Sequence, residues 1–332
     1  MPTVANTTVT WNDLVKLSPM LWFKGASAQA EKVRKGMDLW NLEPMSEFNA
    51  DFSVIPRSGF SHTITENADY PEHLQNQGDT LSMAVQKRGV SYTITEDLMD
   101  GNKYRDIKLG MNDLGTSIIR GIALDMAHFL LSFGFSSSFT DRDGLTKSNG
   151  IVKGSEALYA NTHTMEDGST FDNLVGAVPL SEPNLRTGED LSVDFLDENG
   201  FPVTWEGNIL GTTLDKTNAH AAERLFSNLQ QFQQDAAERN INVYKNMYRH
   251  VDLHYAATLA SGKTDTTNKG KYWCALSSEL LADAALYGLH TAPTPRGPFE
   301  DPFNGGMLWR SKARYDLGFG YAQIGFGSNS TT

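Results

Sequence analysis

The sequence predicts an α+β fold, in which one long helix and several extended strands occupy separate parts of the chain. Apolar residues recur every three or four positions from 107 to 133, the pattern of an amphipathic helix about 40 Å long. Apolar and polar residues alternate instead at 60–65, 81–86 and 309–317, which is typical of strands with one buried face. With 332 residues and 39% apolar content the chain can bury a core, and we expect two lobes.

The composition argues against several classes of protein. Lys and Arg total 28 against 40 Asp and Glu, and a formal net charge of -12 disfavours tight binding to the phosphates of nucleic acid, although the chain could still enclose nucleic acid. We expect no membrane span, because no run of about eighteen apolar residues occurs, and no secretion, because the first residues lack a signal pattern. The single cysteine, Cys274, lies in an apolar segment and is expected to be buried.

Residues 1–56 are expected to form short helical pieces joined by polar links. Thr10 is placed to cap a first turn that ends at Ser18 and Pro19, and a second helix is expected at 28–39. Either this segment is an arm laid across another surface, or it packs on its own domain. The candidate arm contacts are its aromatic residues, Trp11, Trp22, Phe23 and Trp40, with Phe48 beyond them.

Residues 57–95 are expected to form a long hairpin of two strands with a polar, turn-rich tip at 66–79. The second strand should continue to Ile94, and Thr95 is placed to cap a short helical turn at 96–99. A two-stranded hairpin is marginally stable in isolation, so we expect it to need a partner surface. The candidate contacts to a neighbouring subunit are Phe60, His62, Ile64, Tyr70, Leu74, Leu81, Met83 and Val85.

The long helix contains three glycines that weaken it but permit close approach of another backbone. These are Gly110, Gly115 and Gly121, beside the apolar stripe of Ile107, Met111, Leu114, Ile118, Ile122, Met126, Phe129 and Phe133. In the loop that follows, Asp141 to Gly144 resemble part of a calcium-binding loop. However, Phe139 and Gly150 stand where acidic ligands belong, so we expect no metal there.

The rest of the chain is expected to form a mixed lobe and a set of returning strands. The first part should hold a hairpin with strands at 191–195 and 201–205 around a turn at 197–200, then a helix from about 218 to 236. After it we expect a second extended hairpin, in which a strand at 243–255 returns through 272–274. A helix at 278–289 and a proline-rich crossing at 291–303 should lead to the final strand.

The final strand has a basic face. Arg310, Lys312 and Arg314, with Asp316 after them, point to one side of the strand, while Trp309, Ala313, Tyr315 and Leu317 point to the other. Two interpretations remain open: this face is solvated or paired with nearby acids of the same chain, or it contacts an acidic patch on an adjacent subunit.

No pattern in the sequence predicts catalysis, a metal site or a cofactor. His250 and His254 lie in a strand pattern, where four residues span about 13 Å, too far to share one metal ion. The zinc, nucleophile-elbow, phosphate-loop and paired-cysteine motifs are not found. We therefore expect a building block rather than an enzyme.

Four stretches resemble the major capsid proteins of tailed bacteriophages, which have the Hong Kong 97 fold, and most closely the branch of Mu-like major head proteins. They are VQKRGVSYTITEDLMDGNKY, EALYANTHTMEDGSTFDNLVGAVPLS, FLDENGFPVTWEGNILGTTLDKTNAHAAERLFSN and WRSKARYDLGFGYAQIGFGSNS. The resemblance implies an N-terminal arm at 1–56, an extended loop at 57–95 and a peripheral domain at 96–160, with its spine helix at 107–133. It also implies an axial domain at 161–240, with returning strands of both domains at 241–332.

The resemblance implies a shell protein of the virion. Copies would assemble in the host cytoplasm, as hexamers and pentamers, into an icosahedral capsid around double-stranded DNA, with portal and possible decoration proteins as partners. Some relatives cross-link their shell through a lysine of the extended loop, but 57–86 contains no lysine, so we expect no such bond. The arm starts near Met1, which implies a separate scaffolding protein. The alternatives are an encapsulin-like compartment with a protein cargo, and an unrecognised α+β enzyme with a substrate pocket.

Overall fold

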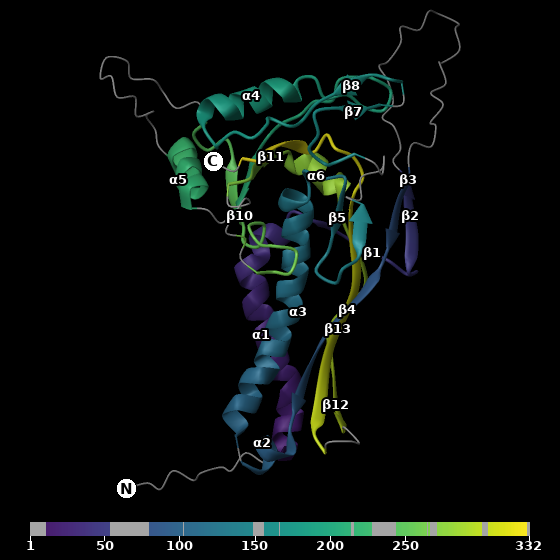
Figure 1. The fold of residues 1–332 in the computed structure, drawn as a ribbon, viewed down its shortest axis with the longest axis vertical. Coiled ribbons are helices and arrows are strands. Elements are labelled where there is room, and N and C mark those ends of the chain that lie inside the picture. Colours follow the sequence, from purple (N-terminus) through teal and green to yellow (C-terminus); the bar gives the residue numbers. More distant parts are fainter. Residues whose placement is uncertain are drawn as a thin grey trace, which may run out of the picture.

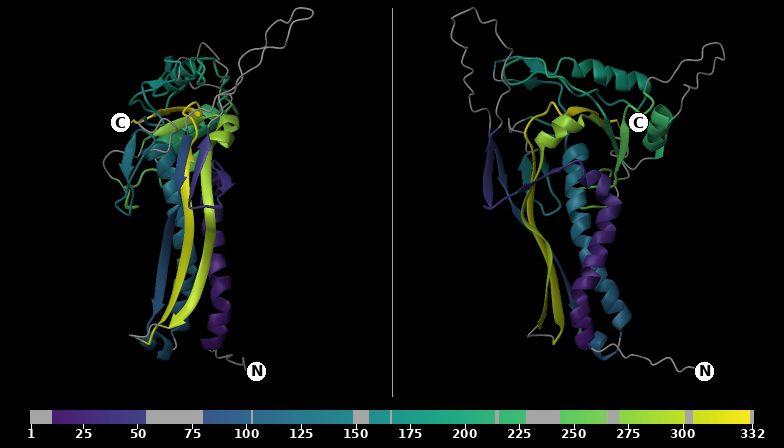
Figure 2. Two further views of the ribbon diagram at one scale, coloured as in Figure 1. Left: turned by 90° about the vertical axis from the view of Figure 1, so that its right-hand side faces the viewer. Right: turned by 180° about the vertical axis from the view of Figure 1, so that it is seen from behind.

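The computed structural model is elongated, with a broad lobe at one end (Figure 1). Two long helices and a long sheet run side by side along the long axis, and short strands and helices form the lobe, as two further views show (Figure 2). The structure describes residues 11–53, 80–101, 103–148, 156–165, 167–213, 216–227, 244–263, 265, 271–300 and 305–330.

Two parallel helices, α1 (Trp11–Met37) and α3 (Tyr104–Ala127), form the elongated part with the sheet, and a π-helical turn (His128–Ser132) extends α3. The predicted stripe of α3 is buried from Ile107 to Phe129, which confirms the long helix. The predicted close approach of another backbone is confirmed at Gly115, where an added Cβ would collide with the carbonyl oxygen of Trp22, whereas Gly110 and Gly121 face the side chains of Tyr92 and Arg142. On α1, a Cβ on Gly25 would likewise collide with the carbonyl oxygen of Asn112.

This contact gives a testable prediction. Gly115→Ala should lower the free energy of unfolding by about 1–3 kcal/mol, because a backbone oxygen cannot move aside as a side chain can. Gly36→Ala is the matched control: it lies in α1, and the nearest atom to its added Cβ is a Leu253 methyl at 3.5 Å. Helix propensity alone should then make Gly36→Ala neutral or stabilising by up to about 1 kcal/mol. Denaturant unfolding of both variants checks this, and equal effects would refute the close contact.

The prediction of two separate helical pieces in 1–56 is wrong, because α1 is continuous through Pro19. Proline cannot donate a hydrogen bond to the carbonyl group four residues earlier. The hydroxyl of Ser18 instead donates to that carbonyl, on Val15, at 2.8 Å. Packing against α3 then holds the helix together across the break in its hydrogen bonding. The predicted cap, Thr10, lies outside the described residues.

The long sheet has the order β1-β12-β13-β4, made of β1 (Asn41–Pro44), β12 (Ala285–Glu300), β13 (Met307–Phe319) and β4 (Gln86–Ile94). β1 is parallel to β12, and the other pairs are antiparallel. Trp309, Ala313 and Tyr315 are buried in the core shared with α1 and α3, so the predicted alternation of β13 is confirmed. The predicted helical turn is also present, as α2 (Glu96–Asp100), but Thr95 before it makes no capping hydrogen bond with its side chain.

The predicted helix at 278–289 and proline-rich crossing are partly wrong. Helix α6 (Ser278–Ala284) ends early, and strand β12 begins at the next residue and runs through Pro293, Pro295 and Pro298. β1 pairs with β12 only from Leu286 to Leu289, so among the described residues the outer half of β12 has a strand on one side only. An edge strand tolerates prolines, because the missing N–H groups need not cost a bond to a neighbouring strand.

Strand β3 (Thr80–Ala84) pairs with β2 (Asn49–Ser53), whereas the hairpin was predicted to pair 81–86 with 60–65. The residues from 54 to 79 lie outside the described part of the chain, and with them the predicted first strand. The β2–β3 pair encloses a small core of its own, in which Leu81 and Met83 pack with Met45.

The lobe is built on a second sheet of order β10-β9-β11-β14: β10 (Arg249–Leu253), β9 (Ile209–Thr213), β11 (Trp273–Leu276) and β14 (Gly325–Ser328). The predicted hairpin of 243–255 with 272–274 is wrong, because β11 pairs with β9 and β14 instead. The strand predicted at 243–255 is shortened to β10 because residues 244–248 form turns. There, the hydroxyls of Tyr244 and Tyr248 both donate to the carboxylate of Glu189, at 2.9 and 2.7 Å.

The predicted hairpin of 191–195 with 201–205 is largely wrong, because helix α4 (Glu182–Ser192) runs through Leu191 and a turn follows at Val193; only an isolated bridge, Leu196 with Pro202, and a bond from the N–H of Val203 to the carbonyl of Phe195 join its two sides. The predicted turn is confirmed: Asp197 accepts the N–H groups of Asn199 and Phe201, and Gly200 adopts φ +75°. Helix α5 (Lys216–Ser227) is the described part of the helix predicted from 218. Short pairs complete the fold: β5 (Ser138–Thr140) with β6 (Thr146–Ser148), and β7 (His163–Thr164) with β8 (Thr170–Phe171).

By length and composition alone, the helical segment Tyr104–Ser132 could cross a membrane. However, 72% of its most apolar window is buried inside the protein, as in the core helix of a folded domain. Cys274 is also buried, as predicted, and burial raises the pKa of its thiol to about 12.

Candidate assembly surfaces

The aromatic residues of the N-terminal segment divide between the core and the surface. Trp22 is buried and its indole N–H donates to the hydroxyl of Ser311 at 3.1 Å, while Trp40 is buried against Phe319. The arm interpretation is therefore wrong for these two tryptophans, which pack on their own domain and cannot also anchor a neighbour. The side chain of Trp11 is outside the described ones, whereas Phe23 is 59% exposed.

Phe23 belongs to an exposed apolar strip on α1 that the sequence analysis did not identify. Leu17, Met20 and Phe23 follow one another at three-residue spacing and are 37%, 68% and 59% exposed. A predicted helix break at Pro19 hid this spacing, because a strip is recognisable only on a continuous helix. An exposed apolar strip of this kind is typical of a surface that another protein covers.

The candidate contacts of the extended loop divide in a similar way. Phe60, His62, Ile64, Tyr70 and Leu74 lie outside the described residues. Leu81 and Met83 are 4% and 1% exposed in the small core of the β2–β3 pair, and Val85 is partly buried against it. Leu81 and Met83 therefore stabilise the β2–β3 pair within their own subunit and do not offer free surface to a neighbour.

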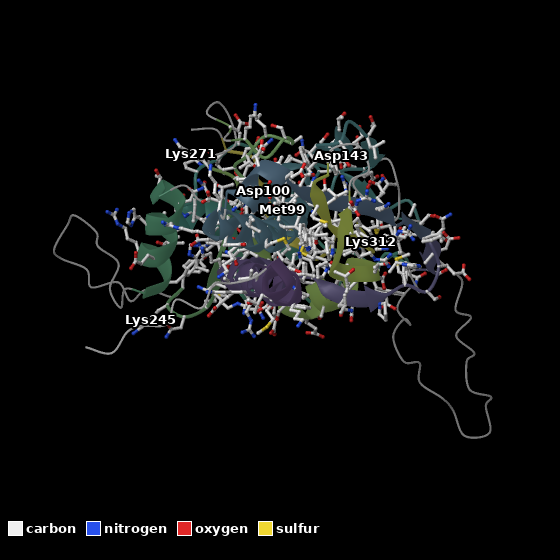
Figure 3. The ribbon with its side chains drawn as sticks, turned by 90° about the horizontal axis from the view of Figure 1, so that it is seen from below. Met99, Asp100, Asp143, Lys245, Lys271 and Lys312 are labelled. Carbon is white, nitrogen blue, oxygen red and sulfur yellow. The ribbon has the colours of Figure 1, made fainter. Side chains whose placement is uncertain are left out.

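The predicted basic face is present on β13 and is larger than predicted. Lys312 lies on the side of β13 that points away from α1 and α3 (Figure 3). Arg310 is directly opposite Arg296 of β12, and Arg314 is directly opposite Lys87 of β4. Opposite residues of antiparallel strands share a face, so five cations lie together. We call this set the basic face: Lys87, Arg296, Arg310, Lys312 and Arg314.

Two cations of the basic face lie against aromatic rings, and acidic side chains do not neutralise the face. The guanidinium carbon of Arg314 lies 4.7 Å from the ring centre of Phe48, and that of Arg310 lies 5.5 Å from Phe299. None of the five cations has an ion pair with a residue in the described ranges. Repulsion from Arg296, then partial burial, then repulsion from Arg314 and Lys87 lowers the pKa of Lys312. This leaves a local excess of positive charge.

On the opposite face of the sheet, Arg88 of β4 is buried in a charged cluster. Its guanidinium donates to Asp141 at 2.9 Å, pairs with Asp143 and lies 4.0 Å from Asp125 of α3. Burial, the largest single effect, would lower the pKa of Arg88, but Asp125, Tyr315 and Asp141 together outweigh it and the pKa is raised. The arginine thus fastens the β5–β6 hairpin to both the sheet and the long helix.

Two further groups complete the Arg88 cluster around Asp125. Arg142 lies 3.5 Å from its carboxylate, and the hydroxyl of Tyr315 donates to it at 2.5 Å. Burial, and then the charge of Asp125, raises the pKa of Tyr315 well above its usual value. A cavity of about 20 Å³ beside the cluster has room for about one water molecule, and a wider hollow of about 650 Å³ also borders it, lined among others by Lys87, Arg142 and Asp143. Burial and charge within this cluster explain the raised pKa values of Arg88 and Tyr315, and the cluster joins the β5–β6 hairpin, the sheet and α3.

The two histidines considered as zinc ligands are separated in the structure. His250 lies on β10, where its ring contacts the hydroxyl of Thr212 at 2.8 Å, and His254 follows the end of that strand. Within the described residues, no group of three His, Cys, Asp or Glu side chains is placed to hold a metal ion.

No protein-family model matches the sequence, and no curated protein matches it either. A solved structure from Gordonia phage Cozz is similar, with 11% identity and a TM-score of 0.52 over 90% of this chain and 86% of that chain. The capsid of a native GTA particle is 11% identical, with a TM-score of 0.49 over 90% of this chain and 91% of that chain. The capsid of Myoviridae phage XM1 is 12% identical, with a TM-score of 0.48 over 89% of this chain and 90% of that chain. The chain therefore has the predicted α+β fold, which it shares with the Gordonia phage structure.

Proposed function

We propose that this chain is a major capsid protein, copies of which assemble as hexamers and pentamers into an icosahedral shell around double-stranded phage DNA. The observation that carries the proposal is the fold shared with the Gordonia phage structure along nearly the whole of both chains. In this proposal the protein acts by assembly and not by catalysis, and its place is the capsid of the virion.

The surfaces of the subunit support an assembly role. The apolar strip on α1 and the basic face on the sheet lie on different elements, so one subunit can engage neighbours on more than one side. A closed shell repeats each contact many times, so contacts that are weak one by one become collectively stable. The net charge of -12 disfavours tight binding of the shell to the phosphates of the nucleic acid that it would enclose.

The first experiment is electron microscopy of the protein expressed alone and then with the products of neighbouring genes. We expect closed particles, or rings of five and six subunits, and we expect correct shells to need a separate scaffolding protein. Co-purifying DNA and a portal protein would support a phage head, whereas a protein cargo would favour an encapsulin-like compartment. A uniform monomer or dimer under every condition would refute the proposal.

The extended loop gives a second expectation for assembled shells. Residues 57–86 contain no lysine, so this segment cannot supply the amine of a lysine cross-link. Shells dissolved in denaturant should give only the mass of the single chain by mass spectrometry. Covalent multimers under those conditions would contradict this expectation.

A further inference from the structure

We infer that the outer edge of β4 binds an extended segment of a second, different protein, which adds a strand to the long sheet. Acidic residues alternate with apolar residues in that segment. The inference goes beyond the proposed shell, because it concerns a partner of the single subunit and holds whether or not the subunit assembles.

The outer edge of β4 is regular and has no partner strand in the described part of the chain. β4 pairs with β13 from Gln86 to Ile94 without a register shift, and it contains no proline. In an antiparallel pair, alternate residues of a strand direct their N–H and C=O groups away from the partner. The edge therefore presents an evenly spaced row of backbone groups, with which an extended peptide can form main-chain hydrogen bonds.

The hollow of about 650 Å³ lies along this edge. Five consecutive residues of β4 line it, Gln86 to Val90, and consecutive side chains of a strand point to opposite faces of the sheet. The hollow is therefore beside the strand and not over one face, and its volume is typical of pockets that enclose a ligand. Its other walls are formed by α3 and the turn between β5 and β6, through Ser117, Ile118, Gly121, Arg142, Asp143 and Leu145.

On the side of α3, an added strand would meet exposed apolar side chains. Val90 points to that side, because the ring of Tyr92, two residues further along β4, lies against Gly110 of α3. Val90 and Leu145 are 39% and 48% exposed, and both line the hollow together with Ile118. Apolar side chains at every second position of the added strand would remove this surface from water.

On the other side, the added strand would meet two cations of the basic face. Lys87 stands on β4 itself, and Lys312 of β13 is directly opposite Gly89. Because Gly89 has no side chain, nothing on β4 at that position separates the Lys312 ammonium group from the edge. Positions 87 and 89 are about 7 Å apart on one face, so two acids spaced by two residues on the added strand would match the two lysines.

This chain does not contain a segment of that pattern. In all 332 residues, the only acids spaced by two positions are Asp141 and Asp143, which have an arginine between them and already pair with Arg88. A second copy of β4 would bring further cations, such as its own Lys87, to a cationic edge. Nucleic acid matches the charge but cannot pair as a strand. The partner that fits the edge is therefore a protein other than this chain.

A synthetic peptide tests the edge on unassembled subunits. The probe is acetyl-Thr-Val-Glu-Val-Glu-Val-Thr-amide with a fluorescent label, and fluorescence anisotropy follows its binding. We expect saturable binding. The same peptide with every backbone nitrogen methylated keeps its charges but cannot donate main-chain hydrogen bonds, so it should bind at least about tenfold more weakly. A peptide of equal composition with its glutamates adjacent should also bind more weakly, because the acids then point to opposite sides.

Charge reversal on the subunit tests the two lysines. Lys87→Glu with Lys312→Glu should lower the affinity for the probe at least about tenfold. The same variant should instead bind a peptide with lysine in place of each glutamate, which shows that it is folded and that its edge is intact. Lys245→Glu with Lys263→Glu is the matched control, because it makes the same change of charge on exposed lysines that do not line the hollow.

Hydrogen exchange locates the contact, because amides at 86–91 should gain protection when the probe binds. No saturable binding up to about 1 mM, equal binding of the methylated peptide, or protection elsewhere overturns the inference. Protection of these amides in subunits alone, as their concentration rises, would make a second copy the partner. Displacement of the probe by a lower concentration of duplex DNA would make nucleic acid the partner. Either result also overturns the inference, whereas a failure to form shells refutes only the proposed function.

Discussion

Replacing Arg88 by methionine is expected to lower the free energy of unfolding of the subunit by about 3–5 kcal/mol. Methionine fills a similar volume, but Asp141 then keeps its negative charge in a buried site without the cation at 2.9 Å, and Asp125 keeps only Arg142, at 3.5 Å. The penalty of an uncompensated buried charge is larger than the value of most surface ion pairs. Equilibrium unfolding of unassembled subunits in denaturant measures the difference.

Two controls separate this explanation from simple loss of packing. Arg120→Met removes an exposed arginine from α3 and should change stability by less than about 0.5 kcal/mol. Adding Asp125→Asn and Asp141→Asn to Arg88→Met removes the unpaired charges and should restore part of the lost stability. If the triple variant were less stable than Arg88→Met alone, the buried charges would not be the cause.

Met83→Asp is expected to destabilise the subunit by about 3–5 kcal/mol, and not merely to impair assembly. Met83 is 1% exposed between Met45 and Leu81, so the new carboxylate would be buried without a cation or a hydrogen-bond donor provided for it. The β2–β3 pair should open first, because its core consists of only these few side chains. Unfolding in denaturant, and proteolysis near the pair, would detect this.

Met20→Asp is the matched comparison, because it places the same substitution on the exposed strip of α1. The side chain of Met20 is 68% exposed, so the subunit should keep its stability to within about 0.5 kcal/mol. Its shells should nevertheless form poorly if the strip is covered on assembly. An unstable Met20→Asp subunit, or a stable Met83→Asp subunit, would contradict the placement of these methionines.

The long helix and the final strand were predictable because periodicity reports burial directly. The stripe from Ile107 to Phe129 and the alternation from Trp309 to Leu317 both face one core, so the pattern and the structure agree. At Pro19, local propensity was misleading, because Ser18 supplies the missing hydrogen bond and packing on α3 supplies the rest. The pairing of β11 with β9 was also out of reach, because sequence patterns identify strands but not their partners.

The candidate surfaces show the same contrast between patterns that the sequence displays and contacts that only the fold creates. Arg310, Lys312 and Arg314 were found from the alternation of one strand, whereas Lys87 and Arg296 join them only through the register of the sheet. The burial of Leu81 and Met83 could not be predicted either, because it depends on Met45 and on pairing with β2. Patterns within one strand therefore indicated which residues share a face, and tertiary contacts decided which faces stay open.

The prolines of β12 have a consequence for how the subunit behaves before it assembles. An open strand edge is a template on which another chain can add a strand and so begin aggregation. Pro293, Pro295 and Pro298 remove three N–H groups from the part of β12 that, among the described strands, pairs with β13 alone, and register shifts interrupt its regularity. A protein that accumulates to high concentration in order to associate must suppress incorrect association. This edge directs subunits away from indiscriminate strand pairing and leaves side chains to determine how they meet.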